Sequence, residues 1–129
     1  MMEYSDKAFR VNIAIAKEYG MAAGLIFQNT LYWVRNNRDN HRKKNYRYGK
    51  WWTFDPVRKY AEKYEFLTPD QIRYALKKLE DGSIIESRKD LNNWGNTKWY
   101  TVIDLDRWAV DTSIEDENEE AENIESLDL

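Results

Sequence analysis

At 129 residues the chain suits one domain with a core large enough to fold without disulfides, and its many aromatic side chains are material for such a core. It has no cysteine and one histidine, His41, which excludes a disulfide framework, a zinc site and a cysteine nucleophile; without a basic-then-apolar leader or a long apolar run, neither secretion nor membrane insertion is expected. The formal net charge of -3 conceals two parts of opposite sign: residues 111–129 hold nine acidic and no basic residues, and residues 1–110 carry +6.

The first half of the chain is predicted to be mainly helical. Phe9–Asn12 has the composition of a short strand, and its last residue can cap a helix that ends at Gly20. Apolar residues at helical spacing predict a longer helix over Met21–Val34, which should be central to the core. The run Arg35–Lys50 is polar, strongly basic and without periodicity, which predicts an exposed loop, and Trp51–Phe54 is typical of a short aromatic strand.

Two helices with clear start signals come next. Asp55 as N-cap precedes Pro56 at the first helical position, and apolar residues then recur at positions i, i+3, i+4 and i+7. Thr68 and Gln71 form the Thr-x-x-Gln pattern of a capping box, which begins a second helix over Pro69–Asp81. Because the connection between the two helices is short, they are predicted to form a helix-turn-helix.

The last third of the chain is predicted to contain a hairpin. Ser83–Ser87 and Lys98–Ile103 are β-rich and flank turn-forming residues, and Asp104–Val110 should form a closing turn or short helix. Helix, turn, helix, hairpin is the order of a winged helix. The predicted fold is therefore α+β: a winged helix-turn-helix with N-terminal helices in a basic domain over residues 1–110, followed by a disordered acidic tail over residues 111–129.

The outer face of the Pro69–Asp81 helix is the first candidate site. On a helical wheel Asp70, Tyr74 and Lys77 point away from the buried stripe, with Arg73 and Lys78 beside them. In helix-turn-helix proteins that face enters the major groove of DNA, where arginine pairs with guanine and lysine meets phosphate. A merely solvated charged face is the alternative, because such faces are the default for a surface helix.

Two further basic segments extend the candidate site. The Arg35–Lys50 loop has the densest positive charge in the chain and could reach phosphates without precise geometry, although a merely solubilising loop is the alternative. The hairpin tip adds cations and Trp94, which either folds back on the hairpin or stacks on a partner. The candidate DNA-binding residues are Arg38, Arg42, Lys43, Lys44, Arg47, Thr68, Gln71, Arg73, Tyr74, Lys77, Lys78, Arg88, Lys89 and Lys98.

The sequence gives little support to catalysis. Ser87 and His41 lack the context of a triad, the acidic pairs lie on no recognisable metal or glycosidase scaffold, and there is no glycine-rich phosphate loop. We therefore expect a binding protein that is not an enzyme and uses neither metal nor cofactor.

Two blocks of the sequence are similar to a known family: "YGMAAGLIFQNTLYWV" (Tyr19–Val34), and "KWWTFDPVRKYAEKYEFLTPDQIRYALKKLEDGSII" (Lys50–Ile85) followed by "NTKWYTV" (Asn96–Val102). Over residues 9–105 they resemble the N-terminal winged-helix domain of phage and plasmid replication proteins of the replisome-organiser type, which are related to DnaD-type primosome proteins. The resemblance implies double-stranded DNA binding in replication initiation or in an accessory role. It also implies DNA and host or phage replication proteins as partners, in the cytoplasm of a bacterial host.

Other functions are compatible with the same sequence. Members of that family usually continue into a second domain that engages the replicative helicase or its loader, whereas this chain ends after a 19-residue tail with nine acidic residues. A transcriptional regulator is the nearest alternative, and a homodimer on a palindromic site would favour it. A phage-encoded inhibitor of a host nucleic-acid enzyme is the third hypothesis, because the chain is acidic overall and Asp70 would repel phosphate. Three roles are open to the tail: it lies across the basic surface as a phosphate mimic, it folds against a partner through Ile124 and Leu127, or it only adds solubility.

Overall fold

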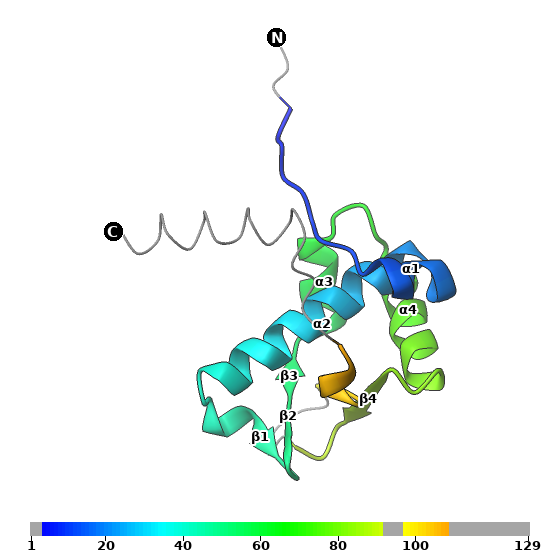
Figure 1. Cartoon of the computed structure of the whole chain (residues 1–129). Coiled ribbons are helices and arrows are strands. Elements are labelled where there is room, and N and C mark those ends of the chain that lie inside the picture. The colour runs from blue at the N-terminus through cyan, green and yellow to red at the C-terminus, as the bar shows by residue number, and fades with distance from the viewer. Residues whose placement is uncertain (1–3, 92–96, 109–129) are drawn as a thin grey trace.

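The computed structural model describes residues 4–91 and 97–108, which form a mixed α+β fold with helices above two small antiparallel sheets (Figure 1). This confirms the predicted α+β class. The α-helices are α1 (Ile13–Tyr19), α2 (Met21–Asp39), α3 (Val57–Lys63) and α4 (Pro69–Asp81). The strands are β1 (Tyr46–Arg47), β2 (Lys50–Trp51), β3 (Thr53–Phe54), β4 (Ile85–Arg88) and β5 (Trp99–Val102), and two short 3-10 helices are η1 (Lys43–Asn45) and η2 (Leu105–Arg107).

The long helix α2 is the centre of the core, as its apolar spacing predicts. It runs across the molecule and contacts α1, α4 and β5 (Figure 1). Gly20 alone separates α1 from α2, at a φ of 100° that side chains rarely adopt, and the two helices then cross closely. A Cβ added at Gly24 would lie 2.9 Å from the Ala16 Cβ and 3.0 Å from the Asn12 carbonyl oxygen, so only glycine fits this crossing.

Helix α4 has the predicted bounds because both of its determinants are local. The Gln71 backbone N–H donates to the Thr68 Oγ1 at 3.2 Å, and the Thr68 backbone N–H donates to the Gln71 Oε1 at 2.8 Å, which completes the predicted capping box. The predicted stripe is buried against the core and consists of Ile72, Ala75, Leu76 and Leu79. The opposite face of α4 is therefore held outwards.

The predicted hairpin is confirmed as an antiparallel pair of β4 and β5, in which Ile85 faces Val102 and Arg88 faces Trp99. β5 also pairs with β3, so the order in this sheet is β3-β5-β4. The expected aromatic strand Trp51–Phe54 is divided at Trp52: β2 pairs with β1, and β3 joins the other sheet. The predicted closing turn is the 3-10 helix η2.

The prediction of one exposed loop over Arg35–Lys50 is wrong. Helix α2 continues through Asp39, and η1 and the β1–β2 hairpin follow. The cause is tertiary: Asn37 and Asn45 are buried, and the Nδ2 of each donates to the Trp52 carbonyl oxygen at 3.0 Å. Polar side chains that are buried because they hydrogen-bond to a backbone group elsewhere in the chain do not produce the apolar periodicity by which a helix is predicted.

Two smaller predictions are also wrong. Phe9–Asn12 forms no strand, because its backbone contact is with a helix: the Asn12 N–H donates to the Gly24 carbonyl oxygen at 3.1 Å. Asn12 does cap α1, since its Oδ1 accepts from the Ile15 N–H at 3.0 Å. Asp55 does not cap α3, whose N-cap position is occupied by Pro56 without a side-chain hydrogen bond.

Candidate nucleic-acid interface

The outer face of α4 carries an exposed tyrosine between two ion pairs. Tyr74 is 63% exposed. On one side of it the Arg73 Nη1 donates to the Asp70 Oδ1 at 2.9 Å. On the other side the Lys77 Nζ donates to the Asp81 Oδ2 at 2.8 Å, and this hydrogen bond raises the pKa of Lys77. The residues predicted to point outwards do so, but each cation is matched by a carboxylate about one turn away.

Three other candidates near α4 have side chains that serve the fold. Thr68 and Gln71 are engaged with each other's backbone in the capping box. The Lys78 ammonium donates to the Tyr19 carbonyl oxygen at the end of α1 and lies 4.6 Å from the centroid of the Tyr74 ring. Fewer side chains of α4 are therefore free to contact a ligand than the sequence predicts.

The β1–β2 hairpin lies against the β4–β5 hairpin. Together they form one surface, which we call the hairpin surface and which carries Arg47, Tyr48, Lys50 and Arg88. The Lys50 Nζ donates to the Glu86 Oε2 at 2.8 Å across the two hairpins. The Arg88 guanidinium lies 4.3 Å from the centroid of the exposed Tyr48 ring. The Arg47 guanidinium lies 5.8 Å from the ring centroid of the buried Trp99. Segments that are about 40 residues apart in sequence thus present their cations side by side.

Several cations of these segments are also paired with carboxylates. The Arg88 Nε and Nη2 donate to the two Asp90 carboxylate oxygens at 2.9 and 2.7 Å, which lowers the pKa of Asp90 and raises that of Arg88. Arg38 pairs with Asp39 at 3.0 Å, and Lys98 lies 4.0 Å from Glu80. Within residues 4–91 and 97–108, the candidate cations that have no carboxylate within ion-pair distance are Arg42, Lys43, Lys44, Arg47, Lys78 and Lys89.

A polar pocket of about 610 Å³ opens between α2, α3 and the segment 42–55. Its lining carries four cations, Arg42, Lys44, Lys59 and Lys63, and one carboxylate, Asp55. Burial raises the pKa of Asp55, an effect that Lys59 and Lys63 oppose. Burial lowers the pKa of Lys63, and Asp55 opposes that shift. Two of these cations belong to the predicted basic loop, whereas the two from α3 were not predicted because a helical wheel does not reveal concavity.

Neutral amides hold two of the pocket cations in place. The Arg42 Nη1 donates to the Asn37 Oδ1 at 3.2 Å, and the Lys63 ammonium donates to the Asn29 Oδ1. Asn37 is itself fixed by its hydrogen bond to the Trp52 carbonyl oxygen. The pocket is therefore preorganised by buried side chains of α2.

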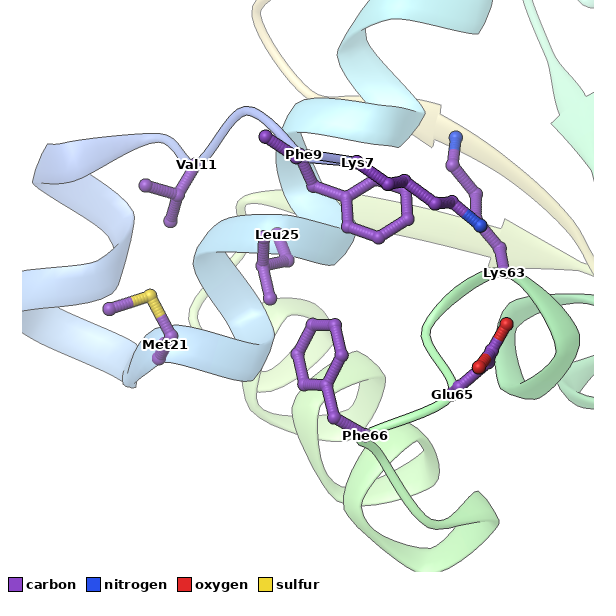
Figure 2. A pocket seen from close by; sticks show the side chains of 9 residues that line it. Lys7, Phe9, Val11, Met21, Leu25, Lys63, Glu65 and Phe66 are labelled. Carbon is purple, nitrogen blue, oxygen red and sulfur yellow. The ribbon is translucent and has the colours of Figure 1, made fainter. Parts of the chain in front are cut away.

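An apolar groove of about 450 Å³ adjoins the polar pocket at Lys63, which lines both, and lies between the N-terminal segment, α2 and the α3–α4 connection. Figure 2 shows Phe9, Leu25 and Phe66 converging on it, with Met21 at one end and Lys63 near the other. Met21 and Phe66 are each 62% exposed. The only sequence signal for this groove is a phenylalanine in the turn between two helices.

The predicted role of Trp94 and the predicted disorder of the tail concern residues 92–96 and 109–129, which lie outside the described residues. In the part of the chain that is described, no group of histidine, aspartate and glutamate side chains is arranged to hold a metal ion, and no helix is long and apolar enough to cross a membrane. Comparison of the chain with protein families, curated proteins and solved structures found no match.

Proposed function

We propose that the chain is a double-stranded DNA-binding protein with a winged-helix fold, in which α4 enters the major groove and the hairpin surface contacts the phosphate backbone. The element order supports this proposal: two helices joined by a short turn, α3 and α4, follow β3 and precede an antiparallel hairpin. The sheet order β3-β5-β4 supports it too, because the strand that precedes the two helices pairs with the hairpin that follows them.

The observation that carries the proposal is the orientation of α4. Its capping box and its buried stripe fix the helix in one rotation, which holds Arg73, Tyr74 and Lys77 on the exposed side. A helix in the major groove reads bases through a few such side chains. Lys43, Lys89 and the hairpin surface add cations that can bind phosphates regardless of sequence.

The ion pairs on α4 do not prevent this role. Both the Asp70–Arg73 and the Lys77–Asp81 pairs are more than half exposed. Exposed pairs of this kind contribute little to stability, so a phosphate or a guanine edge can replace the carboxylate at small cost. Asp70 and Asp81 nevertheless lower the positive potential of the face, so sequence-independent affinity should come mainly from the other basic surfaces.

The biological role that we propose is replication initiation, or an accessory function in replication, of a phage or plasmid in a bacterial host. It rests on the resemblance carried by residues 9–105. A transcriptional regulator has the same recognition chemistry, and it differs in expecting a homodimer on a palindromic site whose half-site spacing mirrors the protein symmetry. Sedimentation of the complex with a selected DNA site distinguishes the two roles.

The DNA-binding proposal is tested by two variants with different expected defects. Arg73→Ala should lower affinity for a selected site by about 1–3 kcal/mol and blur the preference over random duplexes. Lys43→Ala should weaken all duplexes alike and reduce the slope of log K against log salt by about 1. Fluorescence anisotropy at two salt concentrations measures both effects, and identical behaviour of the two variants would contradict the base-reading role of α4.

A protein-binding role is the second candidate, and two observations favour it. The carboxylates on α4 would repel DNA but could pair with a basic partner, and the apolar groove exposes Met21 and Phe66. An inhibitor of a host nucleic-acid enzyme would use such a mixed surface. Capture of one stoichiometric protein from a host lysate, together with no duplex binding at low salt, would favour this role over DNA binding.

A further inference from the structure

We propose that the polar pocket between α2, α3 and the segment 42–55 binds an unpaired nucleotide through its phosphate and its base, either as a free nucleotide or as an unpaired residue of a strand. This goes beyond duplex recognition, in which every base stays in the stack. The pocket volume of about 610 Å³ lies within the range of small-molecule sites, about 300–1,000 Å³.

The charge of the pocket points to a phosphate. Arg42, Lys44, Lys59 and Lys63 line it against a single carboxylate, Asp55. Arg42 and Lys63 are held by the side-chain oxygens of Asn37 and Asn29, which are neutral, so their full charge remains available to an anion. All four residues are exposed, and Lys63 is the one whose pKa is lowered by partial desolvation, so its ammonium gains most from an incoming phosphate.

The pocket differs from the outer face of α4 in how its cations are paired. There Arg73 and Lys77 each form a hydrogen-bonded ion pair with a carboxylate of the same helix. Among the described residues, no carboxylate lies within ion-pair distance of Arg42, Lys44, Lys59 or Lys63. The pocket therefore brings together four cations that have no direct carboxylate partner among the described residues, whereas the outer face of α4 does not.

The lining also offers groups for a base. Trp33 of α2 and Phe54 of β3 contribute aromatic surface, and Phe54 is only partly covered by its stacking on Trp99. Aromatic side chains beside cations are the usual means of binding unpaired bases without strict sequence preference. Asn29 adds a side-chain NH₂ group for which the described residues supply no acceptor, and this group can donate to a base edge.

The pocket is separate from the proposed duplex interface. Its lining comes from α2, the 42–55 segment and α3, and none of its described lining residues belongs to α4, β4 or β5. A nucleotide can therefore occupy it whether or not α4 is bound to a duplex. The failure of one site would leave the other intact.

The test uses two double variants of the full chain with the same change in charge. Lys44→Gln with Lys59→Gln removes two exposed pocket cations. Lys17→Gln with Arg58→Gln is the control pair: it removes two exposed cations that neither line the pocket nor belong to the candidate DNA-binding residues. Binding of deoxyadenosine monophosphate and of an oligothymidine strand is measured by calorimetry, with inorganic phosphate as competitor. The pocket pair should weaken nucleotide binding about tenfold, and the control pair less than about twofold.

Further measurements show whether the ligand is a free nucleotide or part of a strand, and whether the base contributes to binding. Tight binding of the mononucleotide indicates a free nucleotide, and binding of the oligothymidine alone indicates an unpaired strand. Asp55→Asn should tighten either ligand, since it removes the single lining carboxylate, and Trp33→Leu should weaken the nucleotide but not inorganic phosphate. Three results would overturn the proposal. The two double variants could lose equal affinity, or inorganic phosphate could bind as tightly as the nucleotide. The wild type could also fail to bind nucleotide at millimolar concentration. Duplex binding measured on a closed DNA hairpin with the same variants reports separately on the proposed function.

Discussion

Asp70 and Arg73 face each other across one turn of α4, with the Arg73 Nη1 2.9 Å from the Asp70 Oδ1. The carboxylate lies in the first turn of the helix, where it interacts favourably with the helix dipole. It also occupies the place that a DNA phosphate or a guanine edge would take beside Arg73. In the proposed DNA-binding role, stability and DNA affinity would therefore place opposite demands on Asp70.

Asp70→Asn is expected to tighten binding to duplex DNA about three- to tenfold at low salt, because it removes a repulsive charge and releases Arg73. The melting temperature should fall slightly, since the helix loses a favourable charge at its start. Fluorescence anisotropy and thermal unfolding measure the two effects. Glu62→Gln, an exposed change of equal charge on α3, is the control. An equal gain in both variants would show that only net charge matters.

Thr68→Ala should destabilise the fold by about 1 kcal/mol, because the N–H of Gln71 loses its capping acceptor. Thr68→Ser keeps the hydroxyl and should unfold close to the wild-type midpoint in urea. A direct DNA contact by Thr68 would instead appear as a loss of affinity at temperatures where both variants are fully folded.

The features of α4 could be predicted from sequence because they are local. Thr68 and Gln71 are three residues apart, and the stripe from Ile72 to Leu79 repeats with the helical period. The pairing of β4 with β5 could also be predicted from sequence, because turn-forming residues separate the two β-rich runs. These signals need no knowledge of what the elements pack against.

The environment of Asn37 and Asn45 could not be predicted in the same way. Both side chains donate to the Trp52 carbonyl oxygen, a contact that depends on how α2 and the 42–55 segment pack in the folded chain. The polar pocket has the same origin: Lys59 and Lys63 look like ordinary helix-surface cations until α3 packs beside α2. The spacing of Asp70 and Arg73, and of Arg88 and Asp90, permits ion pairs, but spacing alone does not show that the side chains meet and neutralise each other.

Gly24→Ala should destabilise the protein by about 1–3 kcal/mol, although alanine is the better helix former by about 1 kcal/mol. The added methyl would lie 2.8 Å from the Val11 Cγ2 and 2.9 Å from the Ala16 Cβ, closer than van der Waals contact allows. Urea unfolding measures the change, with Ala14→Gly on the exposed face of α1 as a measure of helix propensity alone. A stabilised Gly24→Ala variant would contradict the tight α1–α2 crossing.

The protein should lose stability above about pH 10, the ordinary pKa of tyrosine. Burial raises the pKa of Tyr64 to about 12 and raises those of Tyr60 and Tyr100 as well. A pKa that is higher in the folded state means that the stabilisation is complete below the unfolded value and is lost as pH rises through the folded value. Tyr64→Phe should flatten the fall in melting temperature between pH 9 and 12. An unchanged slope would show that Tyr64 ionises freely in the fold.

The most direct test of the central claim is the anisotropy of a labelled, closed DNA hairpin titrated with the full chain at about 50 and 200 mM salt. Duplex binding through basic surfaces predicts saturable binding at the lower salt and a marked loss of affinity at the higher one. It also predicts that Arg73→Ala and Lys43→Ala both bind more weakly than the wild type at the lower salt. Absence of binding at the lower salt, by a chain that circular dichroism shows to be folded, would contradict the account.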